Sequence, residues 1–210
     1  MNRRALLASA AAFSLLPSLA GAQGLDPTYV DALNRYLNGI TTMQGNFTQQ
    51  SPDGRVAEGK FYMSRPGRLR FEYADPYPTV VVADGYWAGV INREARTLNQ
   101  IPLNQTPLYL LLDSDIDLGA SGAIRSIERG PGVIRVKAID PGKPNEGSIT
   151  MIFSTSPVEL LKWVITDGSG RSSVISLRDV QRGMYIQPTV FVIEDPSGTG
   201  RFTTGEGNRG

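Results

Sequence analysis

The sequence predicts a mostly β protein, built from a single large antiparallel sheet with a few short helices. From residue 43 onward, apolar residues recur with a period of two in many short runs that turn residues separate. Three Asp-Gly pairs, which begin at Asp53, Asp84 and Asp167, lie between such runs and are typical of tight hairpins. The runs follow too closely for helical crossovers, so roughly ten or eleven strands should pair antiparallel. A sheet of that width must curl.

One amphipathic helix is expected over residues 26–40, before the first strand. Asp26 suits the N-cap position, Pro27 the first helical position, and Asn38-Gly39 the end of the helix. Its apolar face comprises Val30, Leu33, Leu37 and Ile40. This spacing predicts a helix with one buried face.

A second, shorter helix is expected over residues 106–112, where it interrupts the strands. Thr106 is a suitable N-cap and Pro107 fits the first turn. Its apolar face comprises Leu108, Leu111 and Leu112. The strands then resume, and the last one is expected over residues 189–195.

Several expected strands are apolar on both faces, which is unusual for a sheet with one face in water. Residues 149–153 and residues 190–193 are examples. The sequence therefore predicts that something covers or occupies the second face of the sheet.

The first 22 residues have the three parts of a cleavable signal peptide. Arg3 and Arg4 supply positive charge, residues 5–16 form an apolar stretch, and residues 20–22 are the small residues that precede a cleavage site. The apolar stretch is shorter than the ~20 residues that a transmembrane helix needs. We expect residues 1–22 to be removed on export and the mature protein to work outside the cytoplasm.

The mature chain is expected to be one soluble domain. Removing 22 of the 210 residues leaves 188, enough for a single domain with a real core. We expect residues 23–198 to form this domain, as a monomer, and residues 199–210 to be a flexible Gly-rich tail. Gln23 stands where an exported lipoprotein has its lipidated cysteine, so no lipid anchor is expected at that position.

The composition excludes several classes of chemistry. Cysteine and histidine are both absent, which rules out disulfides, Cys-His or Ser-His nucleophiles and His-ligated zinc. No nucleotide-binding Gly-rich loop occurs, so no cofactor is expected. Without Arg3 and Arg4 the 21 basic residues become 19, against 20 acidic residues, so no basic field would attract nucleic acid.

Residues 61–73 are the first candidate for a functional surface. Two strands joined at Pro66-Gly67 would form a hairpin, with Arg65 at the rim of its apolar face. The five donors of the guanidinium suit the carbonyls of a loop or helix end laid over that face. An ordinary core hairpin with a solvated arginine is the alternative, which the periodicity alone favours.

Two acidic patterns are weaker candidates. Asp113, Asp115 and Asp117 have calcium-like spacing, but Leu118 and Ile124 occupy the positions where the calcium loop needs Gly and Glu. A glycosidase-like carboxylate pair could come from strand acids, namely Glu72, Glu94, Glu128 and Glu159. Neither pattern has a supporting motif, so we expect no metal site and no enzyme activity.

The order of features resembles one family along essentially all of residues 26–198. After the first helix come residues 45–49, 59–66 and 69–71, Asp84-Gly85, Thr106-Pro107, residues 171–173 and residues 191–198. This collinear set resembles the periplasmic outer-membrane lipoprotein carrier family, LolA. The resemblance implies an unclosed β-barrel whose concave apolar face is covered by short α-helices.

The same resemblance implies a function, partners and a site. Such a carrier takes lipoproteins from the inner-membrane ABC transporter LolCDE, shields their acyl chains in the periplasm, and passes them to the outer-membrane receptor LolB. Arg65 matches the arginine that locks the lid. The lipid-binding cavity is expected to be lined by Phe61, Met63, Leu69, Phe71, Val80, Val82, Trp87, Leu108, Leu111 and Leu112. The alternative is a periplasmic sensor that binds lipid or lipoprotein, although such sensors usually carry a second domain.

Overall fold

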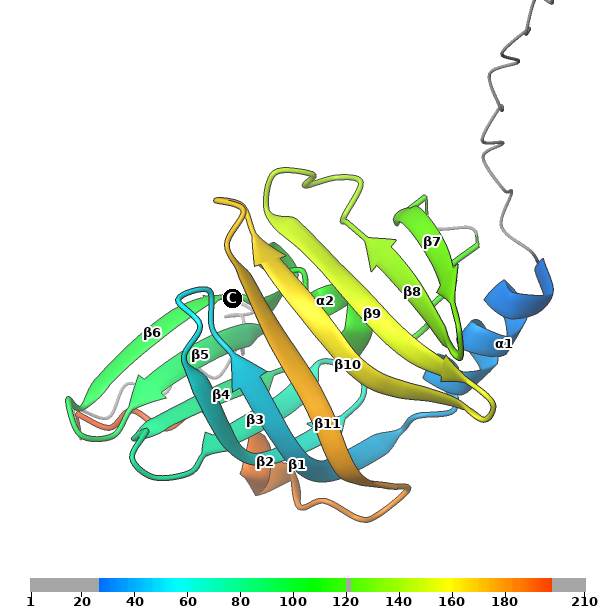
Figure 1. Cartoon of the computed structure of the whole chain (residues 1–210). Coiled ribbons are helices and arrows are strands. Elements are labelled where there is room, and N and C mark those ends of the chain that lie inside the picture. The colour runs from blue at the N-terminus through cyan, green and yellow to red at the C-terminus, as the bar shows by residue number, and fades with distance from the viewer. Residues whose placement is uncertain (1–26, 120–121, 198–210) are drawn as a thin grey trace, which may run out of the picture.

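The computed structural model describes residues 27–119 and 122–197, and within them eleven strands form one antiparallel sheet (Figure 1). The predicted signal peptide and the whole of the predicted tail lie outside the described residues. The strands are β1 (Thr42–Gln50), β2 (Val56–Ser64), β3 (Arg68–Tyr73), β4 (Thr79–Asp84), β5 (Trp87–Asn92), β6 (Thr97–Pro102), β7 (Ile124–Gly130), β8 (Val133–Ala138), β9 (Gly147–Thr155), β10 (Val158–Asp167) and β11 (Ser172–Arg182).

The sheet consists of two meanders, β1–β6 and β7–β11, which meet where β1 pairs with β11. Every other pair joins strands that are neighbours in the sequence. In the described part of the chain, β6 and β7 are the two edges and do not pair with each other. The sheet curls without closing (Figure 1), which confirms the predicted unclosed, mostly β architecture.

The three Asp-Gly pairs all form turns between adjacent antiparallel strands, as predicted. They connect β1 to β2, β4 to β5, and β10 to β11. Asp84 shows why aspartate suits the position, because its Oδ1 accepts hydrogen bonds from the backbone N–H groups of Tyr86 and Trp87, both at 2.8 Å. Gly85 has φ = 110°, a conformation that favours glycine.

The first helix is α1 (Pro27–Asn38), close to its predicted position. Leu33 and Leu37 are fully buried, so the predicted apolar face is the one that packs inside the curled sheet. The Tyr36 ring makes an edge-to-face contact with Phe153, 6.0 Å between centroids, and its hydroxyl oxygen accepts a 2.8 Å bond from the Leu160 N–H.

The segment between β6 and β7 crosses the concave side of the sheet, because those strands are its opposite edges. It contains the 3-10 helix η1 (Leu103–Gln105) and the short helix α2 (Tyr109–Leu112). We call residues 103–118 the lid. Thr106 does not cap α2 as predicted: its hydroxyl donates to the Leu103 carbonyl at 2.8 Å, and the helix begins at Tyr109. The predicted helix over residues 106–112 is therefore shorter than expected.

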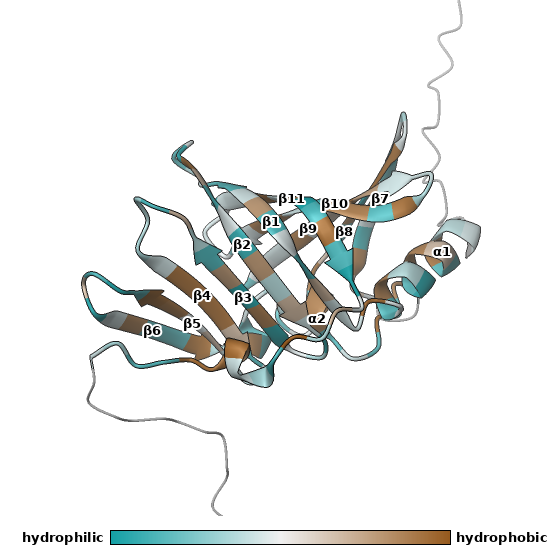
Figure 2. Ribbon diagram, turned by 90° about the horizontal axis from the view of Figure 1, so that it is seen from below, coloured by the Kyte–Doolittle hydropathy of each residue, from teal (hydrophilic) through white to brown (hydrophobic). Residues whose placement is uncertain are grey.

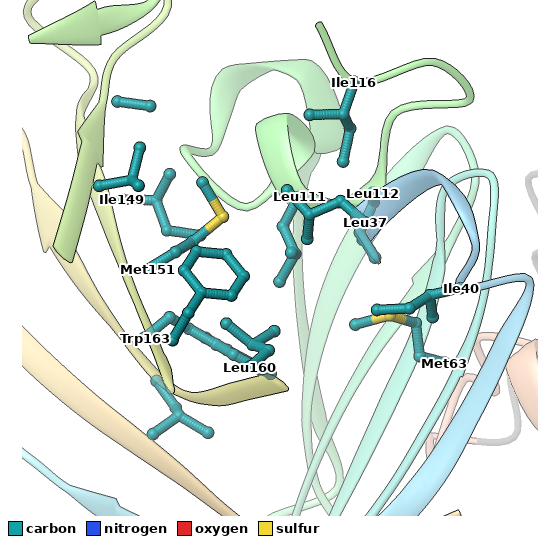
Figure 3. Packing of buried hydrophobic residues seen from close by; sticks show 14 of the residues in the cluster. Leu37, Ile40, Met63, Leu111, Leu112, Ile116, Ile149, Met151, Leu160 and Trp163 are labelled. Atoms are coloured by element: carbon teal, nitrogen blue, oxygen red, sulfur yellow. The ribbon is translucent and has the colours of Figure 1, made fainter. Parts of the chain in front are cut away.

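The core lies between the concave face and the lid. Figure 3 shows Leu111 and Leu112 of the lid between Met151 and Trp163 on one side and Met63 on the other. Each such side chain contributes roughly 1.5–3 kcal/mol when fully buried. The lid thus fills much of the concave face with its own apolar side chains.

The convex face is covered at one end by residues 188–197. We expected the last strand here, and that prediction was wrong: the chain forms the 3-10 helix η2 (Pro188–Phe191) and then runs on without pairing. Phe191 is buried, and Ile193 packs against Val80 and Ile91 of the apolar strands that are brown in Figure 2. Pro188 has no N–H to give to a ladder, and the segment lies across a sheet face instead of along an edge.

Candidate functional site

Arg65 joins the two helical elements that cover the concave face. It stands at the end of β2, and its guanidinium donates to the Asp113 carbonyl just after α2, with a 2.9 Å bond from Nε. The same group donates to the Leu37 carbonyl in the last turn of α1 and to Asn38 Oδ1 at 3.3 Å. A helix end has unpaired carbonyls and a partial negative charge, so a cation suits both positions.

Arg65 stays charged although burial lowers its pKa. Burial lowers the pKa of its guanidinium, while the carboxylates of Asp113 and Asp115 raise it. Arginine starts from so high a pKa that it remains protonated at neutral pH. The turn after Arg65 adds a backbone contact to the lid: the Gly67 N–H donates a hydrogen bond to the Leu112 carbonyl at 2.8 Å.

Two asparagines of α1 form a further link to the lid, which sequence reasoning missed. Asn38 exchanges two hydrogen bonds of 2.9 Å with the backbone of Ile116. Asn34 Oδ1 accepts a 3.0 Å bond from the Leu118 N–H. Asparagine is a poor residue for a helix interior, and two of them one turn apart on α1 were the available signal.

A cavity of about 570 Å³ lies beside the lid and opens to solvent. It lies at the end of the concave face where the β1–β2 and β10–β11 turns meet. It is lined by Gln49, Ser51, Arg55, Ala57, Phe71, Tyr73, Tyr77, Thr79, Val81, Val90, Leu108, Trp163, Ile165, Ser173 and Ile175. Apolar side chains thus dominate its inner part, and polar ones lie near the turns.

The residues that the sequence assigned to the cavity fall into three groups. Phe71 and Leu108 line the open cavity. The second group is buried in the packed core beneath the closed lid, and it comprises Phe61, Met63, Leu69, Leu111 and Leu112. Val80, Val82 and Trp87 form the third group, which the structure does not bring to the cavity.

Val80, Val82 and Trp87 lie on the convex face of the sheet, which corrects their assignment. Val80 and Val82 belong to a separate small cluster with Ile91. Trp87 alternates with Gly89 and Ile91 along β5, so it shares their face. The physical reason is the period of two: Val81, between the two valines in β4, and Val90, three residues after Trp87 in β5, are the ones that line the cavity.

Two of the four glutamates considered as a catalytic pair have structural partners. Glu72 pairs with Arg70 at 2.7 Å and with Arg93 at 3.5 Å. Glu159 pairs with Arg182 at 3.5 Å. Within residues 27–119 and 122–197, no cluster of three acidic side chains could hold a metal ion.

Comparison with known proteins places this architecture in a family. Residues 38–194 match the model of the family described as outer membrane lipoprotein carrier protein LolA. The chain belongs to this family. It is 30% identical over 218 residues to the outer-membrane lipoprotein carrier protein of Alkalilimnicola ehrlichii, which covers 96% of this chain and 94% of that protein. A carrier protein of the same description from Dechloromonas aromatica is 27% identical over 209 residues, covering 94% of this chain and 96% of its own length.

Among solved structures, a LolA superfamily protein from Nitrosomonas europaea superposes with a TM-score of 0.43 at 11% identity, covering 79% of this chain and 96% of that one. A conserved protein from Thermus thermophilus superposes with a TM-score of 0.46 at 13% identity, covering 78% and 92%. As for membrane contact, none of the helices in the described residues of this LolA family member is long and apolar enough to span a bilayer.

Proposed function

We propose that this LolA family member is a periplasmic carrier that shields the acyl chains of outer-membrane lipoproteins and releases them again. The observation that carries the proposal is the lid: an apolar concave face is covered by short elements, which one arginine fastens at two helix ends. We further propose that residues 1–22 are the signal peptide and residues 23–198 the carrier domain.

The cargo site is the concave face itself, in two parts. One part is the open cavity with Phe71 and Leu108. The other is the surface of Phe61, Met63 and Leu69, which the lid covers in the closed state. Acyl chains would replace Leu111 and Leu112 there once the lid moves away, and the protein therefore acts by binding and not by catalysis.

The energetics favour a reversible carrier. A buried methylene contributes about 0.8 kcal/mol, so part of a C16 chain contributes ~10 kcal/mol in gross terms. Opening the lid costs the hydrogen bonds of Arg65 and the apolar contacts of α2, which offsets part of that gain. Free cargo and closed lid thus compete for one apolar face, and the cargo can leave again.

Membership of the family supports a proposal for the partners. We propose that LolCDE loads the protein and LolB unloads it. The test is a reconstituted transfer assay, in which the mature protein takes a triacylated lipoprotein from LolCDE-containing vesicles and delivers it to LolB. Binding to the carrier should require acylation, so the matched control is the same cargo without its lipidated cysteine. Recovery of free phospholipid alone from periplasm, with no triacylated protein, would instead support a lipid sensor.

A further inference from the structure

The barrel is open between the edge strands β6 and β7 (Figure 1), and the two meanders approach each other again at the lid. The lid starts directly after β6, at Leu103, so its first half continues the first meander. The loop between β8 and β9, residues 139–146, belongs to the second meander. These two segments line a shared hollow of about 10 Å³, the room that a single water needs, and therefore lie close together.

A hydrogen bond joins the two segments across this hollow. Lys143 Nζ donates to the Asn104 carbonyl at 2.8 Å, and it lies 3.9 Å from a carboxylate oxygen of Glu146. Arg65, by contrast, fastens a later part of the lid to β2 and α1. The bond from Lys143 thus links the first half of the lid to the second meander, which the contacts of Arg65 do not reach.

Two consecutive β-turns hold Lys143 in place. The Lys143 N–H donates to the Asp140 carbonyl at 3.1 Å, and the Glu146 N–H donates to the Lys143 carbonyl at 3.1 Å. Each turn has a proline at its second position, Pro141 and Pro144, where the fixed φ of proline suits the turn. The loop is therefore stiff before it meets the lid, and less conformational entropy is lost when Lys143 binds there.

The charge of Lys143 compensates negative groups around the hollow. Asp140 and Glu146 line it from the side of the loop, and the Asn104 carbonyl faces them from the lid. The carboxylate of Asp113, partial burial and the carboxylate of Asp140 together raise the pKa of the Tyr109 hydroxyl, so negative charge from the loop reaches the lid. A cation between such groups is stabilising, whereas a neutral side chain would leave two carboxylates opposite a backbone carbonyl.

We propose that Lys143 is a second fastening of the lid, which bridges the open side of the barrel between the first and the second meander. The stiff β8–β9 loop presents one cation to the carbonyl of Asn104, as β2 presents Arg65 to the carbonyl of Asp113. The inference rests on the proposed function only for the purpose of the lid, since the contact itself belongs to the protein without cargo. Closure of the barrel is thus shared by two cations, one from each meander.

Hydrogen exchange with mass spectrometry tests the fastening on the full mature protein without cargo. Lys143→Gln should accelerate exchange at the lid amides of residues 106–110 about three- to tenfold, as expected for one partly exposed hydrogen bond from a cation. Lys143→Arg keeps the charge and the donors and should stay within about twofold of wild type. The matched control Lys137→Gln removes an exposed lysine of β8 that lies outside the hollow, and it should change nothing.

A double variant shows whether the two fastenings are independent. Arg65 and Lys143 share no hydrogen-bond partner, so the effects of Arg65→Met and Lys143→Gln on lid exchange should multiply within about twofold. No acceleration in Lys143→Gln, or no further acceleration when it is added to Arg65→Met, would overturn the proposal. An equal acceleration in Lys137→Gln would also overturn it, because the effect would then come from the net charge of the surface.

Spin labels test the bridge directly, because the chain has no cysteine and takes labels only where cysteines are introduced. Gln105→Cys and Asn145→Cys place labels at exposed positions on the two sides of the contact. The distances between the labels should be narrowly distributed with lysine or arginine at position 143 and should become longer and broader in Lys143→Gln. The same distribution in all three proteins would overturn the bridge.

These outcomes are separate from those of the transfer assay. If the exchange and distance results hold while the protein fails to transfer triacylated cargo, the carrier function fails and the fastening stands. If cargo is transferred while Lys143→Gln leaves the lid unchanged, the fastening fails and the carrier function stands.

Discussion

Replacing Arg65 with methionine should loosen the lid while keeping an apolar stem of similar length in place. Arg65 donates to two part-buried backbone carbonyls, those of Leu37 and Asp113, and to the more exposed Asn38. A hydrogen bond from a charged donor is worth about 1.5–3 kcal/mol, and the third bond counts little because water can replace it. Arg65 is half-buried, so water also reaches part of the first two, which lowers the expected loss to about 2–4 kcal/mol.

This loss should appear as local opening, because the strands do not depend on these bonds. At about 1.4 kcal/mol for each factor of ten, amide exchange in residues 103–118 should accelerate roughly 30- to 700-fold. Hydrogen exchange with mass spectrometry measures it, with β9 and β10 as the internal reference. In the transfer assay, the variant should take up acylated cargo more readily and release it more slowly. The reason is that its closed lid is less stable and therefore competes less well with the acyl chains for the apolar face.

The matched control is Arg68→Met, which replaces the exposed arginine directly after the same Pro66-Gly67 turn. Among the described residues, the Arg68 side chain makes no hydrogen bond or ion pair with the lid, so its replacement should leave exchange unchanged. Equal protection of the lid amides in wild type, Arg65→Met and Arg68→Met would refute the locking role of Arg65. The hydrogen bonds of Arg65 would then make no net contribution to the free energy of lid opening.

Three further predictions test the elements around the site. Asn38→Ala removes both bonds to Ile116 and should destabilise the link between α1 and the lid by about 1–2 kcal/mol, measured as faster exchange at residues 114–118. Phe191→Ala should lower the free energy of unfolding by about 3–5 kcal/mol without changing the uptake of acylated cargo, since Phe191 covers the convex face; a change in uptake instead would contradict that placement. Hydrogen bonds from Ser169 and Arg171 hold the pKa of Asp167 at about 2, below its ordinary 3.8. The stabilisation is therefore present above pH 3.8 and lost toward pH 2, so in urea titrations the advantage of wild type over Asp167→Asn should shrink across that range; a constant difference would refute it.

The mistakes of the sequence-based prediction have specific physical causes. Val80, Val81 and Val82 are consecutive, so hydropathy alone cannot say which of them points to the cavity. Their strand is apolar on both faces because η2 and the residues after it cover the convex side. The same residues 189–195 look like a strand by composition, yet in the structure they lie across a sheet.

The contacts of the lid are a second feature that the sequence could not predict. The sequence indicated a short apolar helix and an arginine at the rim of a hairpin, and both are present. Which carbonyls Arg65 would reach depends on where α1 and α2 end in space, and those ends are 28 and 48 residues away in sequence. The hydrogen bonds from Asn34 and Asn38 to the lid depend in the same way on a contact between residues that are far apart in the sequence.

The sequence by itself determined what depends on neighbours in the chain. It specified the amphipathic face of α1, the hairpin turns at the three Asp-Gly pairs and the antiparallel meanders, since each follows from residues a few positions apart. Only the tertiary structure decided which face of β4 lines the cavity, what fastens the lid, and that a cavity stays open beside it. Those features arise where β1 meets β11 and the β6–β7 connection crosses the sheet, and contacts at such sequence separation leave no periodic trace in the chain.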